Sequence, residues 1–455
     1  MNSNCSKPLD GKDKNKYYYL VNLGCQMNEH DSEIICAILE NIGYLTAKSA
    51  EEADLIMVNT CAVRKKPEDK VASLLGKYKI LKDEKPGLII AVGGCMTQQE
   101  DTAAYLRKRF HHVNLIFGTH ALPRLPELIL KAESSNKTIV DIEEDYADRE
   151  GLPVLHSSSF KAWLPVIYGC NNYCSYCIVP FVRGRERSRS YNSIISEAKL
   201  LAEKGYLEIT LLGQNVNSYG NDLPGSCHFA DLLNGIDRIS GIKRIRFMTS
   251  HPKDLSLELI QAVKEGDNVC EHFHLPVQSG SNNILKIMNR RYTREHYLEL
   301  INQIREMIPG VSITSDIIVG FPGESETDFR DTLDLLKTAR FDNAFSFLYS
   351  PRSNTRAAAF ADQLSHAEKE ERLERLNEVQ HSISIEVNQS LKNKVLEVLV
   401  EGPSKNNDSM QTGRTRTNKL VHFPGPSALT GRLVMVKITE AKTWHLTGEL
   451  EGEIS

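Results

Sequence analysis

The sequence has no long hydrophobic run. Its longest apolar segments, near 88–92 and 317–319, are far shorter than the roughly 20 residues that cross a bilayer. The first sixteen residues are polar and mix Lys with Asp, so they lack the apolar stretch of a signal peptide and the acid-poor character of a transit peptide. We therefore expect a cytoplasmic protein with no membrane span and a short disordered tail over residues 1–16.

The chain also lacks a strong excess of either charge. Its 55 Lys and Arg against 59 Asp and Glu give a formal net charge of −4, so any surface that binds nucleic acid must be local. With 41% hydrophobic and 25% charged residues, the composition excludes a mainly disordered or collagen-like chain. At 455 residues the chain exceeds the roughly 250–300 residues at which one core stops growing, which predicts two or three domains.

Short apolar runs and helical patterns alternate between residues 17 and 132. Parallel strands joined by helical crossovers have this order, so we predict an N-terminal domain over 17–132 that is an open parallel α/β sheet. The expected strands are 17–24, 54–60, 88–94 and 114–120, and the expected helices are 29–41, 67–82, 97–109 and 122–132. The polar, acidic stretch 133–161 indicates a linker.

A second alternation runs from 162 to 390. It predicts an incomplete (β/α)6 barrel, whose functional sites lie at the carboxyl ends of the strands. A long helix near 363–391 is expected to end this domain. The six expected strands lie near 163–169, 207–213, 243–249, 271–277, 311–319 and 343–350.

The last segment, 391–455, changes to short β runs separated by turn residues, which predicts a small all-β barrel. Between Leu391 and His445 there are nine Lys or Arg against four acids. This local positive charge favours contact with single-stranded or loop RNA, and a solvated basic face is the alternative. The predicted RNA contacts in the stretch GRTRTNK are Arg414, Arg416 and Lys419.

Ten cysteines are present, and without an export signal they are expected to be reduced thiols. Cys170, Cys174 and Cys177, here called the loop triad, have the spacing CxxxCxxC. Thiolates at this spacing can bind three irons of one 4Fe–4S cluster and leave the fourth open. S-Adenosylmethionine can chelate an open iron and yield a 5′-deoxyadenosyl radical, with Tyr176 against its adenine. The alternative is structural zinc, which needs a fourth Cys or His nearby, and none follows closely.

Cys25, Cys61 and Cys95, here called the sheet triad, each lie at the end of an expected strand. Because the carboxyl ends of parallel strands meet at one edge of a sheet, we expect these thiols to come together and bind a second cluster with an open iron. The alternative is that they are buried core residues. The other cysteines are expected not to be ligands: Cys5, Cys36, Cys227 and Cys270.

Motifs over nearly the whole chain resemble those of the radical S-adenosylmethionine methylthiotransferases, in particular the MiaB type. The stretches that carry the resemblance are NLGCQMNEHDSE (22–33), NTCAVRKKPEDKV (59–71), YGCNNYCSYCIVPFVRGRERSR (168–189), LLGQNVNSYG (211–220), FMTSHP (247–252), HLPVQSGS (274–281), SDIIVGFPGE (315–324) and TGRTRTNKLVHF (412–423). The resemblance implies the family's domain order: an N-terminal methylthiotransferase domain, a radical barrel over 162–390 and a C-terminal TRAM barrel that binds RNA over 391–455.

The resemblance also implies an activity. It is methylthiolation of carbon 2 of isopentenyl-adenosine beside the tRNA anticodon, with one S-adenosylmethionine as radical source and one as methyl donor. The loop triad would hold the cluster that generates the radical, and the sheet triad would hold the auxiliary cluster that carries the sulfur. Two alternatives remain open. One is methylthiolation of threonylcarbamoyl-adenosine in tRNA or of a ribosomal protein, and the other is a non-catalytic RNA-binding metal protein.

Partners follow from the same resemblance. They are the anticodon stem-loop of tRNA, an electron donor such as flavodoxin or ferredoxin, and a protein that repairs the auxiliary cluster or supplies its sulfur. A monomer is expected.

Four residues at or after barrel strands are placed to meet S-adenosylmethionine in the barrel mouth. In the stretch VGFPGE, a glycine would let the backbone approach a ligand closely, and a plain strand-to-helix turn is the alternative. The four residues are Gln214, Gln278, Asp316 and Gly320.

Alternating arginines follow the loop triad. An extended segment would place all of them on one face, suited to RNA phosphate or to a cofactor carboxylate, and a solvated arginine loop is the alternative. The residues are Arg183, Arg185, Arg187 and Arg189.

Overall fold

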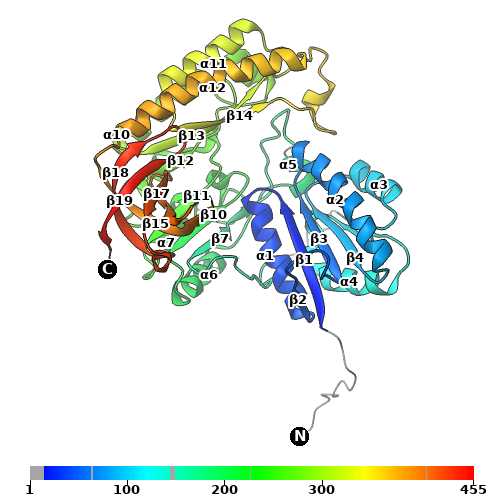
Figure 1. The fold of residues 1–455 in the computed structure, drawn as a ribbon. Helices are drawn as coiled ribbons and strands as arrows, with labels where there is room; N and C mark the ends of the chain where they lie inside the picture. Colours follow the sequence, from blue (N-terminus) through cyan, green and yellow to red (C-terminus); the bar gives the residue numbers. More distant parts are fainter. Residues whose placement is uncertain (1–14, 63–64, 144–148, 226, 406, 455) are drawn as a thin grey trace. The chain divides into compact units, whose positions relative to one another are not determined.

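The computed structural model describes residues 15–62, 65–143, 149–225, 227–405 and 407–454. The chain forms two compact units, Met1–Leu155 and His156–Ser455 (Figure 1). The tail predicted over 1–16 lies almost entirely outside the described residues. Within the described ranges, no helix has the length and apolar character needed to span a bilayer.

The first unit is a six-stranded parallel sheet with the strand order β2-β1-β3-β4-β5-β6. Its strands are β1 (Lys16–Leu23), β2 (Tyr44–Thr46), β3 (Leu55–Thr60), β4 (Ile89–Gly94), β5 (Leu115–Phe117) and β6 (Ile139–Asp141). Its helices are α1 (Gln26–Asn41), α2 (Lys65–Glu84), α3 (Glu100–Arg109) and α4 (Leu125–Ser134). The order reverses between β1 and β3, which is where open α/β sheets place their ligands.

Helices cover both faces of this sheet. Strands β3 and β4 are buried at every position, which explains their nearly unbroken apolar sequences. Leu55 and Met57 of β3 belong to the core that contains residues of α1 and α4. Ile56 and Val58 belong to the core that contains residues of α2 and α3, because successive side chains of a strand point to opposite faces.

Two short edge strands, β2 and β6, were not expected from the sequence. Neither is buried along its length, unlike the equally short but fully buried β5, so neither has the apolar pattern of a central strand. Strand β6 lies inside 133–161, the range predicted as a linker, and pairs in parallel with β5. The Asp141 carboxylate accepts two hydrogen bonds from Arg124, at 2.8 and 2.6 Å, and this ion pair anchors the edge strand.

The second unit begins with an incomplete barrel of parallel strands. Two three-stranded sheets, β11-β10-β7 and β12-β13-β14, are joined by an isolated bridge between Ile245 and Val269. The barrel strands are β7 (Lys161–Pro165), β10 (Glu208–Leu212), β11 (Arg244–Phe247), β12 (His272–His274), β13 (Ser312–Val319) and β14 (Asn343–Leu348). The helices are α6 (Tyr191–Glu203), α7 (Phe229–Asp237), α8 (Leu257–Glu265), α9 (Asn282–Ile287), α10 (Arg294–Met307), α11 (Glu326–Ala339) and α12 (His366–Gln389).

A short excursion separates the first two barrel strands. It contains β8 (Ile167–Tyr168), α5 (Val179–Arg183) and β9 (Arg187–Ser188), with β8 and β9 antiparallel. The sequence predicted one strand over 163–169, which the structure divides into β7 and β8. The loop between β8 and α5 carries the loop triad.

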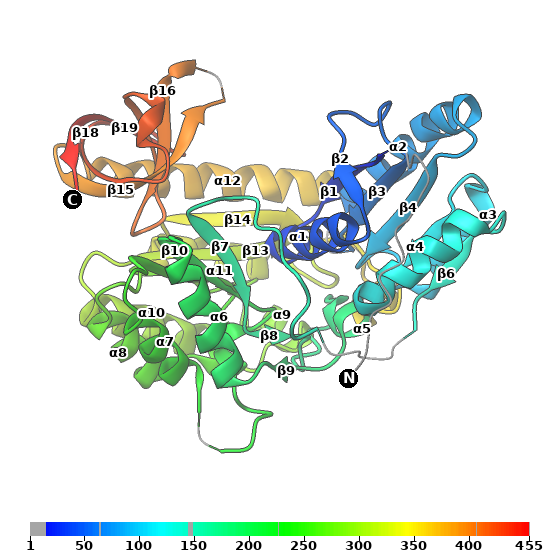
Figure 2. The same cartoon turned by 90° about the horizontal axis from the view of Figure 1, so that it is seen from below.

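A closed five-stranded barrel with the order β15-β16-β17-β19-β18 ends the chain. Its strands are β15 (Val395–Ser404), β16 (Asn407–Thr415), β17 (Leu420–Pro424), β18 (Leu433–Ala441) and β19 (Leu446–Glu453). Figure 2 shows this small barrel at the end of α12. The side-chain amide of Asn388 in α12 donates to the backbone oxygen of Lys442 at 2.7 Å, which ties the helix to the small barrel.

The small barrel is fastened to the amino ends of the strands of the incomplete parallel barrel. Lys161, which begins β7, pairs with Glu401 at 2.6 Å. Arg244, which begins β11 and is fully buried, donates to the Glu397 carboxylate at 2.8 Å and to the backbone oxygen of Arg414 at 2.7 Å. The carboxyl ends of the same strands, where barrels of this kind place their sites, are therefore at the opposite end from the small barrel.

Candidate functional site

The loop triad lies in a tightly folded loop after β8. Cys170 and Cys174 are buried and Cys177 is partly buried. The backbone N–H of Cys177 donates to the oxygen of Cys174 at 2.9 Å. Gly169 has φ 76°, and a Cβ there would lie 2.0 Å from the backbone oxygen of Arg185. Only glycine fits this conformation and this contact, so the turn that starts the loop requires it.

Burial disfavours ionisation of two thiols of the loop triad. Burial raises the pKa of Cys170 to about 11, with the neighbouring Cys174 among the further causes. Burial also raises the pKa of Cys177, and the charges of Cys174 and Cys170 add to that shift. A cluster bound here would replace the protons of these thiols, because metal ligands must be deprotonated.

The sheet triad follows three neighbouring strands, as the sequence predicted. Cys25 comes two residues after the end of β1, and Cys61 and Cys95 come directly after β3 and β4. The strand ends are in register, with Leu23 opposite Thr60 and Thr60 opposite Gly94. The three cysteines therefore follow one line of paired residues at the carboxyl edge, at the point where the strand order reverses.

Two buried asparagines fix the positions of these strand ends. The amide of Asn28 donates to the backbone oxygen of Thr60 at 2.8 Å. The amide of Asn59 donates to the backbone oxygen of Asn28 at 2.8 Å and to Ser32 Oγ at 2.9 Å. Cys25 is the N-cap residue of α1, and its thiol lies 3.4 Å from Asn28 Oδ1. The motifs GCQMN and NTC contain these asparagines, but their role could not be seen without the strand order.

In the described residues, no group of three or more His, Cys, Asp or Glu is placed to hold a single metal ion. The cysteines of a 4Fe–4S cluster bind different irons. Cysteines that bind a cluster therefore stand further apart than the ligands of a single ion, so they need not form such a group.

Three of the predicted cofactor residues are tied to the framework of the barrel. The side-chain oxygen of Gln214 accepts a hydrogen bond from the backbone N–H of Gly169 at 2.6 Å, which links the end of β10 to the loop triad. Gln278, at φ 74°, donates its backbone N–H to the oxygen of Asp316 at 2.9 Å. The Asp316 carboxylate lies 3.6 Å from Nε2 of His274. Gln278 and Asp316 are thus neighbours.

The backbone conformation and the close packing at position 320 require glycine there. It has φ 69°, and a Cβ there would lie 2.3 Å from the side chain of Lys369 in α12. Its backbone N–H donates to Glu324, whose carboxylate pairs with Arg372 at 2.6 Å. This close approach to α12 is a reason for glycine at this position that fits the alternative of a plain strand-to-helix turn, and the approach of Gly320 to a ligand stays a prediction.

The four arginines after the loop triad do not share one exposed face. Arg183 ends α5 and is buried, whereas Arg185 is exposed. Arg187 lies in β9, and Arg189 pairs with Glu197 at 2.6 Å. The expectation of one extended segment is wrong because a short helix occupies its first part.

The basic residues of GRTRTNK also have specific partners. Arg416 donates to the Glu271 carboxylate at 3.0 and 2.6 Å, and Lys419 lies 2.6 Å from Asp342. Both acids directly precede barrel strands, so these ion pairs belong to the docking of the small barrel. The sequence predicted phosphate contacts for all three residues. Of the three, Arg414 has the most exposed side chain, at 40%.

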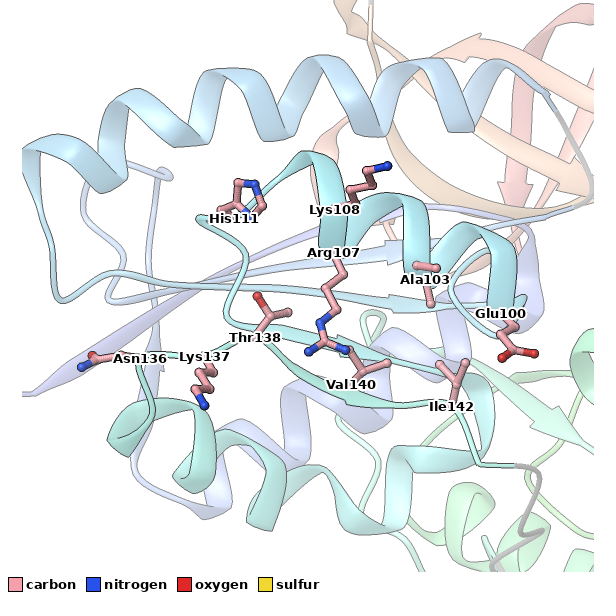
Figure 3. Close-up of a pocket in the computed structure, with 11 residues that line it drawn as sticks. Glu100, Ala103, Arg107, Lys108, His111, Asn136, Lys137, Thr138, Val140 and Ile142 are labelled. Atoms are coloured by element: carbon pink, nitrogen blue, oxygen red, sulfur yellow. The ribbon is translucent and has the colours of Figure 1, made fainter.

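A surface pocket of about 690 Å³ lies in the first unit beside α3 and β6 (Figure 3). Its basic lining residues are Arg107, Lys108, His111 and Lys137. None of the predicted site residues lines it, so it is separate from both triads.

Three protein-family models match the chain. The radical SAM superfamily matches residues 164–336, the uncharacterized protein family UPF0004 matches 17–118, and the TRAM domain matches 389–450. The first match contains the loop triad, and the second contains the sheet triad.

Curated relatives cover nearly the whole chain. The tRNA-2-methylthio-N(6)-dimethylallyladenosine synthase of Thermoanaerobacter pseudethanolicus is 53% identical over 97% of this chain and 94% of its own length. The chain belongs to this family. The synthase of Natranaerobius thermophilus is 52% identical over 96% of this chain and 97% of its own length. Membership in the synthase family confirms the predicted family and the predicted class of transferase.

A solved structure shares the fold. It is the radical S-adenosylmethionine methyltransferase TsrM of Kitasatospora setae, with cobalamin and a 4Fe–4S cluster bound. It covers 76% of this chain and 77% of its own, with a TM-score of 0.55 and 14% identity. Together with the family models, it confirms the predicted fold class. The radical SAM match and membership in the synthase family confirm the predicted cofactors, S-adenosylmethionine and 4Fe–4S clusters.

Proposed function

We propose that this protein transfers a methylthio group to carbon 2 of isopentenyl-adenosine next to the anticodon of tRNA. The observation that carries the proposal is the combination of two separate thiol triads in a chain whose full-length relatives are tRNA-2-methylthio-N(6)-dimethylallyladenosine synthases. Carbon 2 of adenine is unactivated, so acid–base groups alone do not functionalise it. A radical route supplies the missing reactivity.

The loop triad is proposed to hold the radical cluster. A 4Fe–4S cluster there, with one iron open, would supply the electron that cleaves S-adenosylmethionine to a 5′-deoxyadenosyl radical. The chain's own part is to hold the three thiols in one rigid loop. Tyr176, whose ring centroid lies 6.4 Å from that of Phe321, is proposed to lie against the adenine. Gln214, Gln278, Asp316 and Gly320 stay proposed contacts of the cofactor or of its surroundings.

The sheet triad is proposed to hold the auxiliary cluster, which carries the sulfur that is methylated and transferred. Its place at the reversal of strand order suits a bound group. The hydrogen bonds of Asn28 and Asn59 would keep the three strand ends in place as the sulfur is used and rebuilt.

The substrate RNA is proposed to be gripped by exposed basic residues. Arg185 and Arg414 have the exposure that phosphate contact requires. Arg183, Arg187, Arg189, Arg416 and Lys419 would have to leave their present surroundings to do the same. The proposed partners include an electron donor such as flavodoxin or ferredoxin and a protein that supplies sulfur. The proposed state is a cytoplasmic monomer.

Mass spectrometry of tRNA nucleosides tests the function. In a strain without this gene, 2-methylthio-isopentenyl-adenosine should be absent and the unmethylthiolated nucleoside should accumulate. Expression of this protein should restore the product. Restoration of 2-methylthio-threonylcarbamoyl-adenosine instead would show that the substrate is a different adenosine. No change in any nucleoside, with anaerobically purified protein free of iron and sulfide, would support the non-catalytic alternative.

A further inference from the structure

The turn after α9 is hydrogen-bonded to the loop that carries the loop triad. The backbone N–H of Ser175 donates to the oxygen of Met288, and Ser175 Oγ donates to the oxygen of Ile287, both at 2.9 Å. The side-chain amide of Asn289 donates to the backbone oxygen of Tyr173 at 3.0 Å. These bonds hold the residues between the cysteines, so the turn at 287–292 fixes the shape of the loop.

Arg290 in this turn reaches a cysteine directly. Its Nη1 lies 3.5 Å from Cys174 Sγ, its Nε donates to Tyr292 Oη at 2.8 Å, and its Nη2 donates to the oxygen of Pro276 at 2.5 Å. The residue is 7% exposed. The planar guanidinium is therefore held by two neutral acceptors and aimed at one sulfur.

Among the described residues, no ion pair joins the guanidinium of Arg290 to a carboxylate, and its contacts are with Tyr292, Cys174 and Pro276. Burial raises the pKa of Tyr292 to about 12, so this phenol is neutral at physiological pH. Burial and the nearby Arg290 lower the pKa of His251 to about 2, so that imidazole adds no second cation. A buried charge without a partner is costly. The group in contact with Arg290 that a bound cluster would make anionic is the sulfur of Cys174, because thiols that bind a metal are deprotonated.

We propose that Arg290 is a positioning residue that sets the reduction potential of the cluster held by the loop triad. This inference rests on the proposed function, because it requires that cluster. In the step concerned, the cluster accepts one electron from a low-potential one-electron donor, and no bond forms or breaks. A fixed positive charge in a water-poor site stabilises the added electron. A hydrogen bond to a ligand sulfur acts in the same direction.

The test uses full-length protein in which the sheet triad is replaced by Ala, so that one cluster is observed. Reduction is titrated potentiometrically, and the reduced cluster is followed by electron paramagnetic resonance. Arg290→Gln should lower the ratio of reduced to oxidised cluster at a fixed potential about tenfold or more, a shift of about 59 mV for one electron. Arg290→Lys keeps the charge and should stay near the parent. Arg291→Gln is the matched control, because Arg291 is the adjacent and exposed arginine.

Two results would overturn the inference. One is Arg290→Gln with the parent's iron content and potential, and the other is an equal shift in Arg290→Lys and Arg290→Gln. If the Gln variant does not bind iron, Arg290→Lys is compared with Arg290→Met for iron content. Retention by Lys alone supports the charge role, and equal behaviour of the two contradicts it. A parent protein that binds no cluster would contradict the proposed function itself, which is a separate outcome.

Discussion

The loop triad and the sheet triad each bring three cysteines together, but they do so through different parts of the fold. The loop triad lies within eight consecutive residues, on one loop braced by the turn after α9. The sheet triad is drawn from residues 25 to 95 and depends on the pairing of β1, β3 and β4. One triad is local in sequence, whereas the other exists only when a six-stranded sheet has formed.

This difference determines which structural changes would alter the spacing of the cysteines in each triad. A local loop keeps its ligand spacing whenever its own turn and brace are intact. A site assembled from three strands loses its spacing when strand register or the asparagine hydrogen bonds change. The proposed roles fit this division, since the loop triad is proposed to hold the radical cluster and the sheet triad the auxiliary cluster that carries the transferred sulfur.

Replacement of the whole loop triad by Ala should have the largest effect. Without the radical cluster, formation of 5′-deoxyadenosine and of methylthio product should both be abolished, and bound iron should fall by half. The measurement is anaerobic reconstitution followed by iron analysis and product chromatography. Retained cleavage of S-adenosylmethionine would show that the radical cluster lies elsewhere.

Replacement of the sheet triad by Ala should abolish only one of these activities. The remaining cluster should still cleave S-adenosylmethionine, but no methylthio-adenosine should form, because the sulfur carrier is missing. Both products are followed in one assay with tRNA. Methylthio product at the unmodified protein's yield would mean that the sulfur comes from another source.

The two triads also show how far sequence reasoning reached. The spacing CxxxCxxC predicted the loop triad, and the placement of each cysteine near a strand end predicted the sheet triad. The structure has the cysteines of the sheet triad after β1, β3 and β4, and cluster binding by either triad stays a prediction. The contact between Arg290 and Cys174 was not predicted, because nothing in the local sequence of Arg290 indicates contact with a loop more than a hundred residues away. The edge strand β6 was missed because its three residues are only partly buried and lie in a polar, acidic stretch, whereas the equally short β5 is fully buried.

Gly94→Ala should affect the sheet triad but not the loop triad, because it changes the backbone beside Cys95 and leaves all six cysteines in place. Gly94 has φ 106°, and an added Cβ would lie 2.4 Å from the backbone oxygen of Thr60. Backbone strain of this kind costs about 1–3 kcal/mol, and it falls beside Cys95. We expect lower unfolding stability of the first unit and loss of the auxiliary cluster, with the radical cluster retained.

Gly87→Ala is the matched control, because a Cβ there meets nothing within 4 Å. Urea unfolding of the iron-free protein measures stability, and iron analysis of the reconstituted protein measures cluster content. Equal iron in the two variants would contradict the dependence of the sheet triad on strand geometry.

The basic residues of the small barrel also show the difference between what a local sequence pattern predicts and what the folded chain brings together. Its positive charges lie close together in GRTRTNK, and that local pattern predicted an RNA grip. The partners of Arg416 and Lys419 are Glu271 and Asp342 of the radical barrel. These acids are distant in sequence, so no local reading could assign them.

Arg416→Ala should therefore act on stability more than on RNA affinity, and its effect should be the smallest of the four. Loss of the hydrogen bonds to Glu271 should cost about 1.5 kcal/mol in unfolding free energy, the lower end for bonds to a charged group. Arg432→Ala is the control, because its pair with Glu453 is more exposed and should contribute about 0.5 kcal/mol or less. A double-mutant cycle with Glu271→Ala isolates the coupling. If Arg416→Ala instead lowers the salt dependence of tRNA binding by about one phosphate contact and leaves stability unchanged, Arg416 exchanges its carboxylate partner for RNA.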